Sequence, residues 1–145
     1  MNKDLTQNLR QWRKDRNIIE PNTKVFIENI LEELLEICYN NKEEIKDIQN
    51  KIYKEYFEFY VSKCNELEVI DAIQDIQVFC INETELMGYD NLKCNDEVFQ
   101  EINSRQQDPQ QFAEWQKYGA SGKWQKRKDQ EPLTLYKANY EVCKL

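Results

Sequence analysis

The sequence contains no histidine, and it has only three glycines and three prolines among 145 residues. Without histidine, Ser-His-Asp and Cys-His catalysis, Glu-x-x-His di-iron sites and His-ligated zinc are excluded. So few glycines and prolines disfavour a turn-rich β fold and favour long helices. Any chemistry must therefore come from carboxylates, with Lys, Arg, Asn and Tyr side chains in supporting roles.

Long apolar runs are missing as well. No stretch approaches the roughly 18–20 apolar residues that a membrane span needs, and no apolar segment follows residues 1–4 as in a secretory signal. The five cysteines are odd in number and form no C-x-x-C pair, which is typical of reduced cytosolic thiols. The net charge of −7 argues against a nucleic-acid-binding surface. We therefore expect a cytoplasmic protein that binds neither membrane nor nucleic acid.

Apolar residues recur at intervals of three and four along most of the chain, which predicts an all-α bundle of about five helices. Asn65 and Asp96 are suited to cap two of these helices. We expect one domain over residues 1–145, in which residues 116–145 form an extended, basic and partly irregular tail. The predicted helices cover residues 3–16, 23–39, 42–62, 66–87 and 96–105, and 110–118 is a further helical candidate.

The charges are distributed unevenly along the chain. Between Lys24 and Lys42, and again between Lys63 and Lys93, there are together 11 acidic residues and no basic one. The rest of the chain holds 16 acidic and 20 basic residues. The acidic total is therefore concentrated in two base-free windows, each of which coincides with a predicted helix.

Each window contains a pair of carboxylates one helical turn apart: Glu33 with Glu36, and Glu68 with Asp71. Like charges so placed destabilise a helix by about 0.2–0.5 kcal/mol per pair unless a cation relieves them. Two such pairs on facing helices would form an all-oxygen site, which suits Mg²⁺ or Mn²⁺. A nearby Glu could then deprotonate a water for attack on phosphorus.

Two other interpretations of these pairs stay open. Glu-x-x-Glu is common on solvated helix surfaces, and Glu33 and Glu36 lie away from the centre of their helix's apolar stripe. Their burial therefore requires a second packing partner, for which another subunit is a candidate. Alternatively, the chain is a non-enzymatic acidic helical module that binds a basic protein or mimics nucleic acid.

Written as motifs, the pairs are E-x-x-E at residues 33–36 and E-x-x-D at residues 68–71. They resemble the all-α nucleoside triphosphate pyrophosphohydrolases, the superfamily of MazG, the dimeric dUTPases and phosphoribosyl-ATP pyrophosphohydrolase. Residues 101–105 (EINSR) resemble the segment that follows the metal helices in MazG-like members. Residues 122–126 (GKWQK) and 136–140 (YKANY) resemble the tail of some phage and bacterial MazG-like proteins. The 31 residues between the two motifs form a longer interval than is usual in MazG.

The resemblance implies a helical bundle that forms a homodimer or homotetramer. It implies Mg²⁺, with Mn²⁺ as a substitute, held by Glu33, Glu36, Glu68 and Asp71. The implied reaction converts a nucleoside triphosphate, with dUTP or another deoxynucleotide favoured, to the monophosphate and pyrophosphate. Glu33 or Glu36 would be the catalytic base. Phosphoribosyl-ATP is the alternative substrate.

A triphosphate carries about four negative charges, so cationic side chains must help the metal to hold it. Residues 117–145 contain seven bases and three acids, and residues 1–24 contain six bases and three acids. Asn103 is a candidate on the resemblance alone. The alternative for each basic residue is a solvated charge of the tail. The candidate phosphate-binding residues are Asn103, Arg105, Lys123, Lys126 and Lys137.

Overall fold

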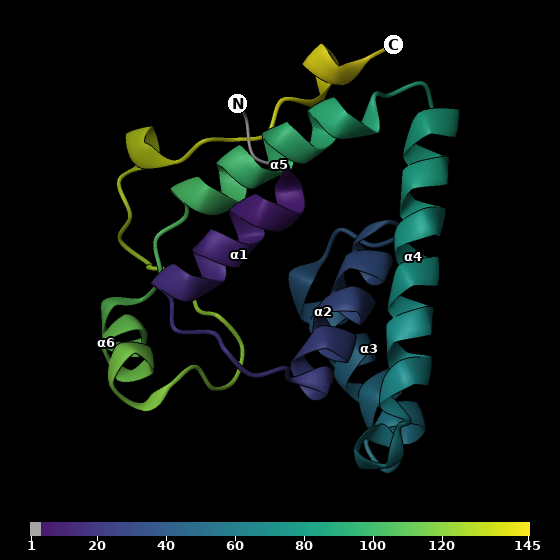
Figure 1. Ribbon diagram of the computed structural model, residues 1–145, viewed down its shortest axis with the longest axis vertical. Helices are drawn as coiled ribbons and strands as arrows, with labels where there is room; N and C mark the ends of the chain where they lie inside the picture. The colour runs from purple at the N-terminus through teal and green to yellow at the C-terminus, as the bar shows by residue number, and fades with distance from the viewer. Residues whose placement is uncertain (1–3) are drawn as a thin grey trace. The chain divides into compact units, whose positions relative to one another are not determined.

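The computed structural model describes residues 4–145 (Figure 1). Within this range the chain contains no β-strand, which confirms the all-α prediction. Lys3, the first residue of the first predicted helix, lies outside the described residues. Among the described residues, no helix combines the length and apolar character that a membrane crossing requires. The six α-helices are α1 (Leu5–Asp15), α2 (Thr23–Glu36), α3 (Lys42–Ile52), α4 (Glu66–Leu86), α5 (Asn91–Ser104) and α6 (Pro109–Tyr118).

Side-chain caps set where the helices begin. Asn65 accepts a hydrogen bond from the backbone N–H of Glu68 at 3.2 Å, so the predicted cap of α4 is confirmed. The predicted cap of α5 is wrong, because Asp90 rather than Asp96 accepts from the first-turn N–H of Leu92 at 3.0 Å. Helix α5 consequently begins five residues earlier than the sequence analysis places it.

The third predicted helix does not continue to residue 62. Helix α3 ends at Ile52 and is followed by a π-helical turn, η1 (Tyr53–Phe57), and a 3-10 turn, η2 (Val61–Lys63). The N–H of Glu58 bonds to the carbonyl of Tyr53 at 2.9 Å, five residues back, which widens the turn. This widening occurs in a run of aromatic residues, where the rings of Tyr53 and Phe57 stack with centroids 6.5 Å apart.

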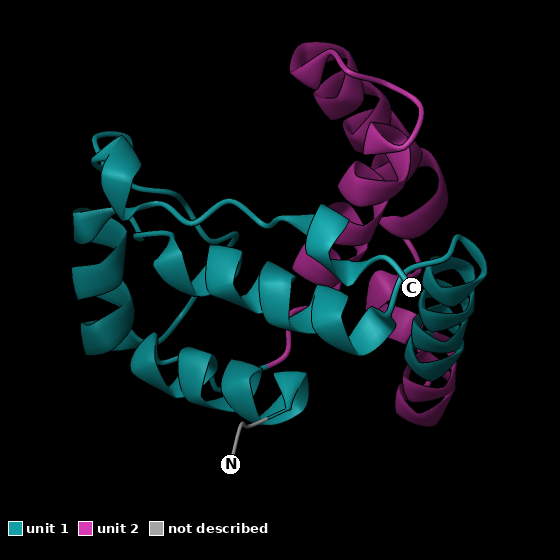
Figure 2. Ribbon diagram, turned by 90° about the horizontal axis from the view of Figure 1, so that it is seen from above, with its two compact units in different colours: residues 1–20, 73–145 teal, residues 21–72 magenta. Residues whose placement is uncertain are grey.

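The contacts of the chain form two compact units (Figure 2). One unit comprises residues 21–72. The boundary between the two units falls within α4. In this unit α2 packs against α3, and Ile45 and Tyr53 are buried. The buried Gln49 side chain donates a hydrogen bond from Nε2 to the carbonyl of Glu28 at 2.7 Å, which joins the two helices. The unit is therefore a small helical pair with a correspondingly small core.

The other unit comprises residues 4–20 and 73–145, and α5 lies at its centre, in contact with α1 and with the C-terminal 3-10 turn η4 (Tyr140–Cys143). Trp115 is 3% exposed and Cys143 is fully buried. The carbonyl of Cys143 accepts from the N–H of Asp90 at 2.8 Å. The predicted extended tail is therefore not confirmed, since its last residues pack into the core.

Glu97 of α5 holds this C-terminal segment in place. Its Oε1 accepts a hydrogen bond from the Tyr136 hydroxyl at 2.6 Å and another from the N–H of Asn139 at 2.8 Å. The hydrogen bond from Tyr136, followed by that from Asn139, holds the pKa of the Glu97 carboxyl below its ordinary value. A single carboxylate thus fixes two points of the segment to α5.

The Glu97 contacts predict a pH-dependent stability. A carboxyl whose pKa is lowered on folding stabilises the folded state above its unfolded pKa of about 4.3, and this stabilisation is lost as the pH falls through the folded pKa. We expect Glu97→Gln to lower the urea midpoint clearly at pH 7 and much less at pH 3. The exposed Glu83→Gln is the matched control. Equal losses for Glu97→Gln at the two pH values would show that the ionised carboxylate does not hold the segment.

Candidate functional site

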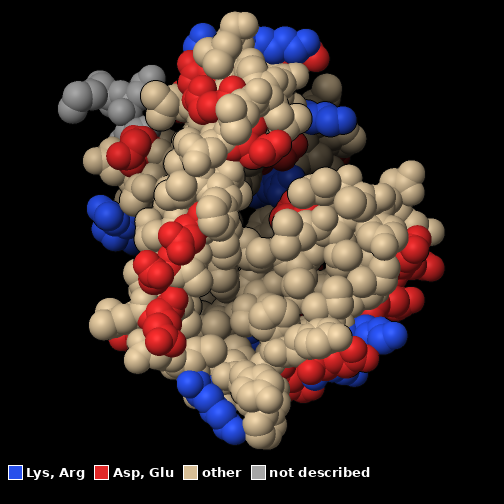
Figure 3. All heavy atoms as spheres, turned by 90° about the vertical axis from the view of Figure 1, so that its right-hand side faces the viewer, with Lys and Arg blue, Asp and Glu red and all other residues tan. Residues whose placement is uncertain are grey.

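The four predicted metal ligands lie on two helix ends of one unit. Glu33 and Glu36 occupy the last turn of α2, and Glu68 and Asp71 occupy the first two turns of α4. All four residues are exposed. Acidic side chains are scattered over the surface in Figure 3, with Lys and Arg side chains also present.

The two acidic pairs lie at opposite ends of their helix dipoles. No basic residue lies in the last turn of α2, so no cation of that turn offsets the negative charge of Glu36 at the negative end of the helix dipole. Glu68 lies at the positive end of α4, where a carboxylate is favoured. The helix dipole therefore disfavours the carboxylate of Glu36 and favours that of Glu68.

One chain does not gather these carboxylates into a cluster. Among residues 4–145, no three Asp, Glu or Cys side chains lie close enough together to hold a metal ion. Glu36, Glu68 and Asp71 form no side-chain ion pair with another residue in the described part of the chain. The donor set nevertheless has the right chemistry, since each pair offers hard oxygen ligands one helical turn apart.

Large apolar side chains are exposed on the same two helices. On α4, Leu67 is 77% exposed and Phe79 is 68% exposed, and Leu34 of α2 is 57% exposed. Several exposed apolar side chains on one helix are a common feature of protein–protein contacts. The other apolar residues exposed on α4 are Ile70, Val78, Ile81 and Leu86.

A basic pocket of about 490 Å³ lies at the C-terminal end of α5. It brings together three of the five predicted phosphate-binding residues, Arg105, Lys126 and Lys137, whereas Asn103 and Lys123 are not part of its lining. Two further basic residues of the lining, Arg127 and Lys128, were not predicted from the sequence. The basic run at residues 126–128 could have indicated them. The full lining is Glu101, Arg105, Lys126, Arg127, Lys128, Gln130, Pro132, Leu135, Tyr136 and Lys137.

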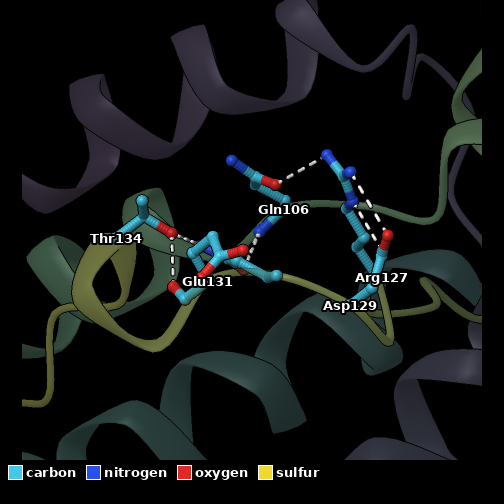
Figure 4. Close-up of polar contacts among 6 residues, drawn as sticks. Gln106, Arg127, Asp129, Glu131 and Thr134 are labelled. Atoms are coloured by element: carbon cyan, nitrogen blue, oxygen red, sulfur yellow. Dashed lines mark hydrogen bonds and ion pairs between the residues drawn. The ribbon is translucent and has the colours of Figure 1, made fainter.

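Arg127, which lines this pocket, is held by Asp129 and Gln106 (Figure 4). Its guanidinium donates to Oδ1 of Asp129 at 2.7 Å and to Oε1 of Gln106 at 3.1 Å. The hydrogen bond to Asp129 raises the pKa of Arg127, and the same bond lowers the pKa of Asp129. Both groups therefore stay charged, and the guanidinium keeps a defined orientation.

A second pocket, of about 390 Å³, is uncharged. Burial, and next the hydrogen bond with Cys143, raise the pKa of Cys94 to about 11. A thiol with so high a pKa stays protonated at neutral pH and is a poor nucleophile. This pocket therefore offers no cationic side chain to a phosphate, and its Cys94 thiol is not activated for covalent catalysis. It is lined by Thr84, Met87, Tyr89, Cys94, Asn95, Val98 and Tyr140.

No protein family, curated protein or solved structure matches this chain. The resemblance to the all-α pyrophosphohydrolases therefore stays a prediction from the motifs at residues 33–36 and 68–71.

Proposed function

We propose that this protein is a Mg²⁺-dependent nucleotide pyrophosphohydrolase, which converts a nucleoside triphosphate, with dUTP or another deoxynucleotide favoured, to the monophosphate and pyrophosphate. One observation carries the proposal: two exposed carboxylate pairs, each one helical turn apart, stand at the end of α2 and the start of α4 in a chain without histidine. Such a donor set selects a hard divalent cation, and Mn²⁺ is the expected substitute.

The proposed chemistry divides between the two acidic pairs. Glu33, Glu36, Glu68 and Asp71 would hold the cation, and Mg²⁺, when bound, would neutralise phosphate charge and make water more acidic. Glu33 or Glu36 removes a proton from the attacking water. The water oxygen forms a bond to phosphorus, the phosphoanhydride bond breaks, and pyrophosphate leaves with the bonding electron pair.

The proposal includes a homodimer or homotetramer. Two exposed apolar residues are sequence neighbours of the acidic pairs: Leu34 follows Glu33, and Leu67 precedes Glu68. A second copy that covers this surface would remove apolar area from water, which is the main driving force of association. It would also cover the exposed Glu33 and Glu36 side chains at the end of α2.

The experiment that tests the proposal is a substrate panel. The purified protein is incubated with Mg²⁺ and each of the eight common nucleoside triphosphates, and with phosphoribosyl-ATP, and pyrophosphate release is measured. We expect release from at least one deoxynucleotide. Pyrophosphate release from phosphoribosyl-ATP alone would support the proposed reaction and show that phosphoribosyl-ATP is the substrate. If no compound is hydrolysed, the enzyme proposal fails and the acidic binding module takes its place.

A further inference from the structure

The basic pocket at the end of α5 has more positive charge than its own acids neutralise. Its lining contains five basic residues and one acidic residue, Glu101. Glu101 is paired with Arg105 at 3.0 Å, and Arg127 is paired with Asp129 at 2.7 Å. The amines of the three lining lysines form no ion pair with any residue in the range 4–145. These three lysines are Lys126, Lys128 and Lys137.

The pocket is held by a hydrogen-bonded frame. Gln130 joins two parts of the chain: its Oε1 accepts from the N–H of Gln106 at 2.8 Å, and its Nε2 donates to the carbonyl of Ser104 at 2.7 Å. The N–H of Arg127 donates to the carbonyl of Gln106 at 2.8 Å. The N–H of Tyr136 donates to Oγ of Ser104 at 2.8 Å. The segments that carry the basic side chains are therefore fixed relative to the end of α5.

Many donors around the pocket remain available. A guanidinium has five N–H donors and an ammonium has three. Arg127 uses three of its five on Gln106 and Asp129, and Arg105 uses one of its five on Glu101. A ligand that satisfies donors from several directions needs several adjacent anionic oxygens, as in a chain of phosphate groups.

We propose that this pocket binds the phosphate chain of a polyphosphate compound, such as pyrophosphate, inorganic triphosphate or a nucleoside triphosphate, without a divalent metal. Its volume of about 490 Å³ is in the range of small-molecule sites. All its residues belong to the unit of residues 4–20 and 73–145, whereas the carboxylates proposed to hold Mg²⁺ belong to the other unit. The site goes beyond the proposed hydrolysis and does not depend on it.

Calorimetric titration of the full chain with sodium tripolyphosphate, in EDTA, tests this site. We expect saturable one-site binding, with pyrophosphate weaker and orthophosphate weakest. The double variant Lys126→Ala/Lys128→Ala should weaken binding by about tenfold or more, because two charge-assisted contacts are lost. The matched control is Lys93→Ala/Lys117→Ala, which removes the same charge from exposed positions of the same unit outside the pocket. It should change the dissociation constant by about twofold at most, through long-range charge alone.

Two further variants separate this site from the metal site and from folding effects. Glu68→Gln/Asp71→Asn should leave tripolyphosphate binding in EDTA unchanged, whether or not the protein is an enzyme. Lys137→Glu, which reverses one lining charge, should weaken binding without altering the thermal midpoint. Absence of tripolyphosphate binding by the wild type, or equal loss in the lysine control, would overturn the proposal. Tighter binding of duplex DNA than of tripolyphosphate would also overturn it, in favour of a nucleic-acid surface.

Discussion

Glu36→Gln and Asp71→Asn are each expected to lower kcat/KM for Mg²⁺-dependent triphosphate hydrolysis by roughly 100-fold or more. Each change keeps the size of the side chain and removes the negative charge that would bind the cation. Both residues are exposed and form no ion pair in the described part of the chain, so the fold should be unaffected. Steady-state kinetics over a range of Mg²⁺ concentrations, with a thermal midpoint for each variant, measures the effect.

The control for these variants is Glu83→Gln, an exposed carboxylate further along α4. It should retain wild-type activity, because it belongs to neither acidic pair. If Glu36→Gln or Asp71→Asn weakens metal binding, the variant should need a higher Mg²⁺ concentration to reach half of its maximal rate. If Glu36→Gln or Asp71→Asn retains full activity, the metal assignment is wrong, even if the protein hydrolyses nucleotides.

Leu67→Glu/Phe79→Glu on α4 is expected to convert the proposed oligomer to a monomer of about 17.6 kDa. Burial of one large apolar side chain contributes about 1.5–3 kcal/mol to an interface. A carboxylate at the same position would have to be desolvated without a partner. Light scattering coupled to size-exclusion chromatography measures the mass, and hydrolysis should fall together with the oligomer.

Leu133→Glu is the matched control for the interface, because Leu133 is fully exposed and lies on a 3-10 turn away from α2 and α4 in the sequence. It should leave the oligomer intact. A monomeric wild-type protein at micromolar concentration would contradict the proposed assembly. A monomeric protein that still hydrolyses triphosphates would show that one chain is sufficient for catalysis.

The fold class could be predicted because it depends on local pattern. Apolar spacing located α1, α2 and α4 within a few residues, and Asn65 acts as the cap that its side chain suggests. The start of α5 was misplaced because Asp90 and Asp96 are equally good caps in isolation. Tertiary context decides between them, since the N–H of Asp90 bonds to Cys143, more than fifty residues later.

The C-terminal segment shows where local pattern stops being informative. Its high charge, glycines and proline are typical of a solvated tail, yet Tyr136 and Asn139 bond to Glu97 across 39 and 42 residues of sequence. No periodicity signals such a contact. For the same reason Arg105, Lys126 and Lys137 could be predicted from the sequence only as separate candidates. The fold shows that they share a pocket with Arg127 and Lys128.

The most direct test of the proposed enzyme is a product-resolved time course with the best substrate of the panel, in Mg²⁺ and in EDTA. Chromatographic separation and phosphorus NMR identify every phosphate species. The proposal predicts equimolar monophosphate and pyrophosphate in Mg²⁺, slower formation of the same products in Asp71→Asn, and none in EDTA. Release of orthophosphate and diphosphate instead, or equal rates in Mg²⁺ and EDTA, would contradict it.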